Sequence, residues 1–378
     1  MVLLLSFFGL AALIFIAALL ADGVRMLLRR RRLEDERRPL ELVVAGQQEA
    51  ADHLVCLTLT RPGGGRLPAF SAGQHVLLQV PAGPGGKRLQ RAYSLAAWTK
   101  KPRCYELGIK REAQGAVSRW ARENLRAGAR VQVLPPRGDF VLREGPGELV
   151  LIGGGIGITA MRAMLHAALA ENRRRPRVIL FYAARTQMEL LWHGEFQALA
   201  AAHRNFHYRP LLSRPEPGWM GESGRLSAAL VLRAPAAPQR ADFYLCAGSG
   251  LMDALHAGLL EANVGAGRVH REAFGVAPGA GESGHTITLS DGTQLVTAGE
   301  PTLLATLEAH LRAPASECRS GSCGQCRMRL LDGRVRWLLA PELKSDDGEI
   351  LPCVCVPEGD IRLAACLNSD EVRQAQLA

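Results

Sequence analysis

Four cysteines near the end of the chain have the residue type and the spacing to hold an iron–sulfur cluster. Cys318, Cys323 and Cys326 follow the pattern C-x4-C-x2-C, and a further 26 residues separate Cys326 from Cys353. Three thiolates from one loop and a fourth from a later segment are typical of the ligands of a [2Fe–2S] cluster. The pattern therefore predicts a centre that accepts and releases electrons one at a time.

Arg91, Tyr93 and Ser94 carry groups that could bind a flavin. A flavin needs an aromatic face against its ring, a hydroxyl near its reactive edge and a cation for its phosphate. On a strand, Arg91 and Tyr93 would share one face. The string Arg-Ala-Tyr-Ser is short, and a strand with one buried tyrosine is the alternative interpretation.

Two further segments have the composition of phosphate sites. Gly115 and Ser118 stand at the start of a predicted helix, Ser118–Leu125, with Ser118 as its N-cap, although an ordinary capped helix is the simpler interpretation. A predicted strand, Glu148–Ile152, then enters a glycine-rich turn before the predicted helix Thr159–Ala170. The spacing differs from G-x-G-x-x-G, but the strand before and the helix after favour a dinucleotide site. The candidate residues of this turn are Gly153, Gly154, Gly155, Gly157 and Thr159.

Cys246 ends another predicted strand, Ala241–Cys246, and a glycine-containing turn follows it. Open parallel sheets bind ligands at the carboxyl ends of their strands, so this position favours a site. The alternative is a small buried side chain, which is the usual environment of a free cysteine.

The elements that must position these residues change character along the chain. Residues 41–143 contain short strands separated by Gly/Pro turns, which predicts an antiparallel β-barrel. Residues 144–275 alternate strands with helices, including an expected helix Glu189–Ala201, and this predicts a parallel sheet covered on both faces. The expected barrel strands are Glu41–Val44, His53–Thr60, Gln74–Val80, Arg91–Leu95, Tyr105–Lys110 and Arg130–Val133.

The C-terminal part begins after a Gly/Ala/Pro linker, residues 276–283. Residues 284–366 should contain a hairpin that turns at Asp291 and Gly292 and a helix, Pro301–Leu311, before the cysteine loop. Residues 367–378 are a tail without an assigned element. Cys355 and Cys366 are alternatives to Cys353 as the fourth ligand, and Cys355 more simply packs in the interior.

The N-terminal residues predict a membrane anchor. Residues 2–21 are twenty residues without a charged side chain, long enough for a transmembrane helix, residues 1–22. Arginines are concentrated in the following linker, residues 23–40. The positive-inside rule then predicts a single-pass protein of the inner (cytoplasmic) membrane with its catalytic domains in the cytoplasm and the lipid bilayer as a partner. A cleaved signal peptide is the alternative, but it would carry its basic residues before the apolar run.

The net charge of +10 is distributed unevenly. Residues 39–283 carry 30 Lys and Arg against 19 Asp and Glu, whereas residues 284–378 carry 9 against 13. Since no nucleic-acid motif is present, no nucleic-acid partner is expected. A basic body joined to an acidic C-terminal part favours docking between them. The nine cysteines show no pairing pattern, which argues against a disulfide scaffold.

The order of these motifs resembles the ferredoxin–NADP reductase superfamily, and residues 284–366 resemble a plant-type ferredoxin. The resemblance rests on Arg91–Ser94, Gly115–Ser118, Gly138–Phe140, Gly153–Thr159 and Cys246–Met252. It implies a multidomain fold, with an FAD-binding antiparallel β-barrel, an NAD(P)-binding α/β domain and an α+β β-grasp ferredoxin domain. The fusion is similar to the reductase components of bacterial oxygenases, fatty-acid desaturases and hybrid-cluster proteins.

The resemblance also implies roles for particular residues. Gly115 and Ser118 would hold the flavin pyrophosphate, which favours FAD over FMN, and Cys353 would be the fourth cluster ligand. Residues Gly153 to Thr159 would bind the dinucleotide. The flavin would be held by Arg91, Tyr93, Ser94 and Lys110, and hydride transfer would take place among Ser94, Cys246 and Phe274.

Coenzyme choice would rest on a group of basic and hydroxyl side chains. Arginines favour the 2′-phosphate of NADPH, whereas a carboxylate on the ribose favours NADH. We therefore expect NADPH, with NADH as the alternative, and a basic docking surface is the other explanation of these side chains. The group comprises Arg185, Ser213, Arg214 and Arg225.

These features together predict an NAD(P)H-dependent oxidoreductase. Electrons would pass from the coenzyme to FAD, then to the [2Fe–2S] cluster, and then to a separate acceptor, which we expect to be a membrane desaturase or hydroxylase. A hybrid-cluster protein is a second candidate acceptor. A flavin and iron–sulfur redox sensor with little turnover is a different kind of function that the same residues could serve.

Overall fold

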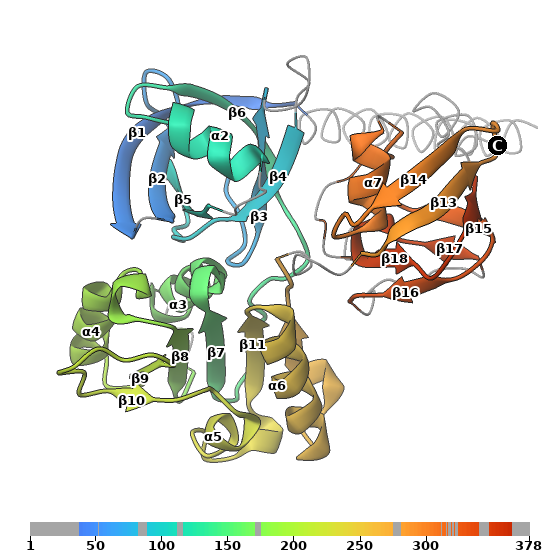
Figure 1. Ribbon diagram of the computed structural model, residues 1–378. Helices are drawn as coiled ribbons and strands as arrows, with labels where there is room; N and C mark the ends of the chain where they lie inside the picture. Colours follow the sequence, from blue (N-terminus) through green and yellow to red (C-terminus); the bar gives the residue numbers. More distant parts are fainter. Residues whose placement is uncertain are drawn as a thin grey trace, which may run out of the picture.

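The computed structural model describes residues 38–51, 53–81, 89–111, 116–170, 175–274, 281–310, 312–314, 316, 319, 321, 324–339 and 348–364. Several predictions fall outside these residues: the anchor 1–22, most of the linkers 23–40 and 276–283, and the tail 367–378. The same holds for Gly115, Cys318, Cys323 and Cys366. The described residues form a β-barrel, a parallel-sheet domain and a smaller C-terminal domain (Figure 1).

The N-terminal barrel is an antiparallel sheet that closes on itself. Its strands are β1 (Leu40–Ala51), β2 (Leu54–Thr60), β3 (His75–Val80), β4 (Leu89–Ser94), β5 (Cys104–Lys110) and β6 (Arg130–Arg137), in the order β4-β3-β6-β1-β2-β5. An isolated bridge between Leu95 and Leu107 joins the two edges. Alternating apolar residues such as Leu57, Val76 and Leu107 fill the interior, and α2 (Ala116–Asn124) packs Val117 against it.

Several boundaries in the barrel differ from the predictions: β4 begins at Leu89 instead of Arg91, and β6 continues to Arg137 instead of ending at Val133. β1 continues well past Val44, because register shifts between Val44 and Gly46 and between Glu49 and Ala51 bend the strand and keep it paired with β2. The helix α2 begins at Ala116, so Ser118 lies within its first turn and the prediction of Ser118 as an N-cap is wrong.

The central domain is a parallel sheet with helices on both faces. Its strands are β7 (Leu149–Gly154), β8 (Val178–Ala184), β9 (Phe206–Leu212), β10 (Glu222–Ser223), β11 (Asp242–Cys246) and β12 (Val269–Arg271), in the order β10-β9-β8-β7-β11-β12. Leu151 and Leu180 face α3 (Ile158–Ala170) and α4 (His193–Ala202). Ile152 and Phe181 face α5 (Ala228–Leu232) and α6 (Ser249–Glu261). Burial on both faces explains why these strands are continuous apolar runs.

Short turns separate some of these elements. The 3-10 helix η2 (Gly155–Gly157) connects β7 to α3, and η3 (Gln187–Glu189) follows β8. The expected helix Glu189–Ala201 therefore begins only at His193, after Trp192 has turned the chain with a φ of 56°.

The C-terminal domain is a mixed sheet crossed by one described helix. β13 (Ser283–Leu289), β14 (Gln294–Ala298), β15 (Met328–Asp332), β17 (Glu349–Ile350) and β19 (Ile361–Leu363) pair in the order β14-β13-β19-β15-β17, and β16 (Val335–Trp337) pairs with β18 (Cys355–Pro357). Leu303 and Leu307 of α7 (Leu303–Ala309) pack on the buried face of this sheet. The helix is shorter than the expected Pro301–Leu311, because Thr302 caps its start by accepting a hydrogen bond from the Ala305 amide.

The prediction of an inner-membrane location is corrected by the structure. No helix in the described part of the chain is long and apolar enough to cross a bilayer. The longest described helices, α3 and α6, have 13 residues each. At about 1.5 Å per residue they extend about 20 Å, against a hydrocarbon core of about 30 Å.

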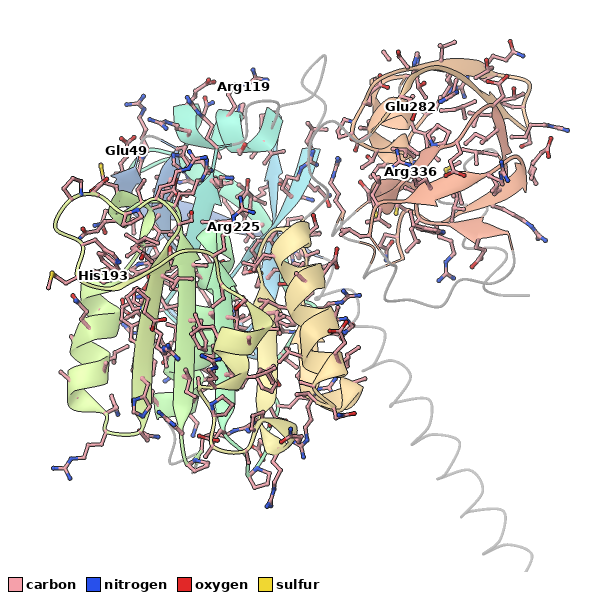
Figure 2. The ribbon with its side chains drawn as sticks, turned by 60° about the horizontal axis from the view of Figure 1, so that its bottom comes forward. Glu49, Arg119, His193, Arg225, Glu282 and Arg336 are labelled. Atoms are coloured by element: carbon pink, nitrogen blue, oxygen red, sulfur yellow. The ribbon has the colours of Figure 1, made fainter. Side chains whose placement is uncertain are left out.

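The domains meet at the ends of elements that carry the predicted site residues. The carboxyl ends of β7, β8 and β11 point toward the barrel, and the C-terminal domain lies beside β4 of the barrel (Figure 1). Arg225 lies on the central domain, whereas Glu282 and Arg336 mark the separate C-terminal domain (Figure 2). This arrangement brings candidate residues from distant parts of the sequence together.

Candidate flavin, nucleotide and iron–sulfur sites

A cavity of about 300 Å³ lies where the three domains meet. The barrel contributes the strand residues predicted for the flavin, the central domain contributes Thr159 and Phe274, and the C-terminal domain contributes Arg319 and Cys353. The predicted flavin residues that line it are Arg91, Tyr93, Ser94, Lys110 and Ser118.

The polar groups in this cavity suit a ligand with a hydrogen-bonding ring and an anionic phosphate. Ser94 is buried, and its Oγ has no hydrogen-bond partner among the described residues. Burial, together with the nearby charge of Arg319, lowers the pKa of Arg91 to about 10. Arg319 is paired with Glu308, whereas Arg91 Nη1 donates to the backbone oxygen of Gln90 at 2.8 Å. A buried hydroxyl without a described partner and a guanidinium that lines the same cavity fit a flavin and its phosphate.

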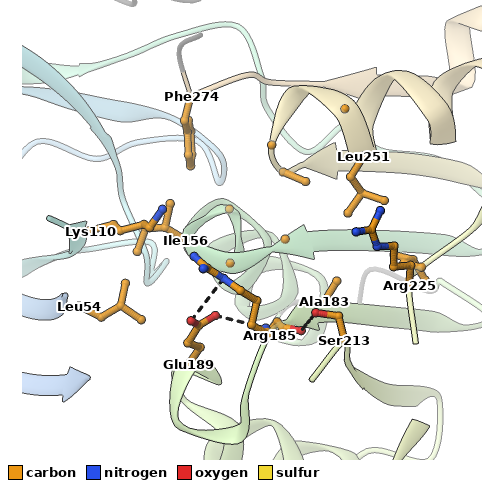
Figure 3. A pocket seen from close by; sticks show the side chains of 18 of the residues that line it. Leu54, Lys110, Ile156, Ala183, Arg185, Glu189, Ser213, Arg225, Leu251 and Phe274 are labelled. Carbon is orange, nitrogen blue, oxygen red and sulfur yellow. Dashed lines mark hydrogen bonds and ion pairs between the residues drawn. The ribbon is translucent and has the colours of Figure 1, made fainter. Parts of the chain in front are cut away.

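A second cavity, of about 680 Å³, opens on the central domain beside the first. Gly154, Gly155 and Gly157 of the glycine-rich turn line it, with Ala247 and Gly248 from the turn after β11. Lys110, Ile156 and Phe274 line both cavities. Figure 3 shows Phe274 directed into this space, with Lys110 and Ile156 on one side and Leu251 and Arg225 on the other.

Close packing explains the glycines of the turn. A Cβ at Gly157 would lie 1.9 Å from the backbone oxygen of Cys246, and one at Gly154 would lie 2.6 Å from the Ala247 side chain. Gly155 has a φ of +54° and faces open space. The turn therefore presses on the end of β11 and leaves its backbone accessible from the cavity, which suits a phosphate-bearing ligand. Gly153 packs against Ile158 instead.

The candidate coenzyme-selecting residues are only partly brought together. Arg185, Ser213 and Arg225 line the larger cavity, whereas Arg214 is exposed and is not one of its lining residues. Arg185 Nε lies 3.6 Å from Glu189 Oε1, and the Ser213 hydroxyl donates to the Ala184 oxygen at 3.5 Å (Figure 3). The lining of the cavity thus includes two arginines and a carboxylate.

Cys246 and Phe274 differ in their access to the cavities. Cys246 is fully buried at the end of β11, where burial and the nearby Glu272 raise the pKa of its thiol well above the ordinary value. Its chain neighbour Ala247, not Cys246, lines the larger cavity. Phe274 is 44% exposed and stands where the two cavities meet.

The three described cysteines of the C-terminal domain belong to two different apolar clusters. Cys326 and Cys353 are both buried in one apolar cluster with Leu304 and Leu351, and Cys353 also reaches the smaller cavity. Cys355 packs in the main core of the C-terminal domain beside Ile287. This placement favours Cys353 over Cys355 as the fourth ligand.

Several cavity residues were not predicted from the sequence. Gly108 lies two residues before Lys110 on β5, so strand alternation alone could have placed it on the same face. Arg319 follows the predicted cluster ligand Cys318 directly in the sequence, and this position is a signal that could have predicted it. His75 and Glu272 line neither cavity, but His75 Nδ1 on β3 lies 3.8 Å from Glu272 Oε1, two residues before Phe274, and no sequence pattern links these two residues.

Comparisons with known proteins support the same division of the chain. Residues 51–142 match an oxidoreductase FAD-binding domain, residues 151–257 an oxidoreductase NAD-binding domain, and residues 287–358 a 2Fe-2S iron–sulfur cluster binding domain. The chain therefore has domains for FAD, a nicotinamide coenzyme and a [2Fe–2S] cluster.

Proteins that are similar to this chain over most of their own length include reductases of oxygenase systems. The chain is 30% identical to the ferredoxin reductase component of 3-ketosteroid-9-alpha-monooxygenase from Mycolicibacterium smegmatis, covering 85% of this chain and 95% of that protein. It is 29% identical to the vanillate O-demethylase oxidoreductase of a Pseudomonas species, covering 83% and 96%. The solved structure of phthalate dioxygenase reductase matches with a TM-score of 0.65 and 26% identity, over 87% of this chain and 98% of that chain.

The cavities at the domain junctions, the buried cysteine pair and these matches agree with one another. The chain belongs to the family of oxygenase reductase components, in which FAD-binding and NAD-binding domains of the ferredoxin–NADP reductase type are followed by a [2Fe–2S] domain.

Proposed function

We propose that this protein is the NADPH-dependent reductase of an oxygenase system and delivers electrons to a separate oxygenase. The observation that carries the proposal is the smaller cavity, where Ser94, Thr159 and Cys353 from three different domains line one space. The proposed route for electrons therefore runs from the coenzyme cavity to the cysteine cluster without leaving the chain. The names of the relatives, a monooxygenase component and a demethylase oxidoreductase, support an oxygenase as the acceptor.

The proposed domain limits are 41–143 for flavin, 144–275 for coenzyme and 284–366 for the cluster. When bound, the flavin takes a hydride from the coenzyme and the cluster carries electrons singly. Arg91 would hold the flavin phosphate, Ser94 would donate a hydrogen bond to the ring, and Tyr93 would pack on it. Gly115 and Ser118 would hold the pyrophosphate, and Lys110 would lie between the two ligands.

The residues of the central domain would hold and orient the coenzyme. The glycine-rich turn from Gly153 to Thr159 would receive its phosphates. Phe274 would cover the flavin face and exclude water until the nicotinamide binds. Cys246, buried behind Ala247, would support the wall of the cavity next to the nicotinamide. Arg185, Ser213 and Arg225 support NADPH as the coenzyme, whereas Glu189 beside Arg185 would favour NADH.

The cluster would be held by Cys318, Cys323, Cys326 and Cys353. This assignment is supported by the common burial of Cys326 and Cys353 and by the separate packing of Cys355. A plant-type cluster would have a potential near about −400 mV unless hydrogen bonds raise it.

The test is to measure turnover of the purified protein. It should contain flavin and about two iron atoms per chain, and NADPH should support continuous reduction of cytochrome c or ferricyanide. NADH should be less effective. If the protein carried both cofactors but took up electrons only once, without turnover, the reductase function would be wrong and a redox sensor would be favoured.

A further inference from the structure

Arg162 of α3 forms a charged network that the proposed chemistry does not use. Its side chain is only 8% exposed. Within the central domain it donates from Nε to Glu195 Oε1 at 2.9 Å and from Nη2 to Glu195 Oε2 at 2.8 Å. Its guanidinium also lies 4.6 Å from the centre of the Trp192 ring. A planar guanidinium held on two edges and one face has a fixed orientation.

The same side chain also crosses the domain boundary. Arg162 Nη1 donates to Glu106 Oε2 of β5 at 2.7 Å and to the backbone oxygen of Ala96 at 3.1 Å, and both acceptors belong to the barrel. Burying these charges is favourable only because each is paired, so removing one partner leaves an uncompensated group. The contact is therefore a strong constraint on how the two domains sit together.

This contact lies one helical turn from the proposed site of chemistry. Thr159, three residues before Arg162, lines the smaller cavity, and its methyl group would lie 2.6 Å from a Cβ at Gly108. Gly108 stands on β5 between Glu106 and Lys110, and Trp192 is also close to it, at 3.7 Å from the same Cβ position. The first turn of α3 and the ion pair thus press on one strand of the barrel, the strand that carries Lys110 between the two cavities.

We propose that Arg162 is a positioning residue for hydride transfer. By fixing the first turn of α3 against β5, it sets the distance between the coenzyme turn and the flavin residues of the barrel. This inference rests on the proposed reductase function. It differs from a stabilising role inside the central domain, because the bonds of Arg162 to Glu106 and Ala96 cross the boundary whereas its bonds to Glu195 do not.

Two isosteric substitutions separate these roles. Glu106→Gln removes the charge that pairs with Arg162 across the boundary, and Glu195→Gln removes the one within the central domain. In anaerobic stopped-flow mixing with saturating NADPH, Glu106→Gln should lower the limiting rate of flavin reduction by about tenfold to a hundredfold, the effect of a small misplacement. Its apparent Kd for NADPH should change by less than about twofold, since no coenzyme contact is removed. Glu195→Gln should keep the rate within about threefold of wild type.

Hydrogen exchange gives a second readout that needs no coenzyme. Glu106→Gln should speed amide exchange in residues 104–110 and 158–162, and Glu195→Gln should do so less. Flavin and iron contents should equal those of the wild type in both variants. Equal losses of rate in the two variants would indicate a merely structural ion pair, and a wild-type rate with unchanged exchange in Glu106→Gln would overturn the inference. A wild-type protein that no coenzyme reduces would refute the proposed function, while the exchange experiment would still decide whether the contact exists.

Discussion

At the scale of single residues, the Ser94 hydroxyl is a buried group that lacks a described hydrogen-bond partner and that a ligand could satisfy. It is buried and has no described partner, so replacing it should not destabilise the flavin-free protein. We expect Ser94→Ala to leave the unfolding free energy of the flavin-free protein within about 0.5 kcal/mol and to weaken flavin binding by about 1 kcal/mol, the usual value of one hydrogen bond. Flavin titration and urea unfolding measure the two quantities. A large loss of stability without flavin would contradict this assignment.

Arg225 and Arg214 form a matched pair for coenzyme selection. Arg225 lines the larger cavity, whereas Arg214, also a surface arginine near the end of β9, does not. Because a charged hydrogen bond to a phosphate is worth about 1.5–3 kcal/mol, Arg225→Ala should raise the KM for NADPH by about tenfold or more. The KM for NADH should stay within about twofold, and Arg214→Ala should change neither value. Steady-state kinetics with both coenzymes measure these KM values. Equal changes in Arg225→Ala and Arg214→Ala would contradict the prediction.

At the scale of elements, the turn between β7 and α3 depends on close approach of two backbones. A Cβ at Gly157 would lie 1.9 Å from the Cys246 oxygen, whereas one at Gly194, in α4, would meet nothing within 4 Å. Gly157→Ala should therefore destabilise the protein by about 1–3 kcal/mol and weaken coenzyme binding. Gly194→Ala should instead stabilise it by about 0.5–1 kcal/mol, as for alanine in a helix. Thermal unfolding and coenzyme titration distinguish these outcomes.

The contact between α3 and α4 should make stability depend on acid. Burial by itself would raise the pKa of Glu195, but hydrogen bonds from His166 and Arg162 outweigh it and lower the pKa to about 2, from an ordinary value of 4.5. A depressed pKa contributes stability above the unfolded value, and this contribution is lost as the pH falls from about 4.5 toward 2. In Glu195→Gln this part of the acid dependence should be absent. Urea unfolding between pH 6 and pH 3 gives the unfolding free energy of each protein. If the prediction is wrong, this free energy will fall equally with pH in the wild type and in Glu195→Gln.

Most elements could be predicted from the sequence because their periodicity follows burial. β11 ends at the expected Cys246, and α3 begins one residue before the expected start and ends at the expected Ala170. The start of α4 could not be predicted, because the left-handed Trp192 is stabilised by Arg162 and Gly108, which are distant in sequence. The short elements α5, β10 and β12 were missed for a related reason, since two to five residues give no period.

At the scale of the whole molecule, the order of motifs predicted the domains but not their shared walls. The strand Arg91–Ser94, the glycine-rich turn Gly153–Thr159 and the cysteine loop can each be recognised from a short stretch of sequence. Their convergence on one cavity depends on how three domains pack, and contacts such as His75 with Glu272 leave no local pattern.

Replacing Cys353 should interrupt the proposed electron transfer from the flavin to the cluster. This residue lines the smaller cavity and belongs to the buried cluster that contains Cys326, whereas Cys355 belongs to the neighbouring apolar cluster around Ile287. We expect Cys353→Ser to lose most of its iron and its cytochrome c reduction, while NADPH still bleaches the flavin. Cys355→Ser should keep about two iron atoms per chain. Iron analysis and absorbance at 450 nm test both, and the reverse pattern would assign Cys355 as the ligand.

The composite cavity also limits how freely parts of this protein can be exchanged with those of its relatives. Pro301, Leu304 and Arg319 belong to the C-terminal domain, yet they line the smaller cavity, where we propose that the flavin binds. A chimera that received a foreign ferredoxin module would thus acquire a new partner surface and, in the same step, a different environment for the flavin. Transplanting only residues of the C-terminal domain that do not line this cavity would change the partner surface and keep the proposed flavin environment.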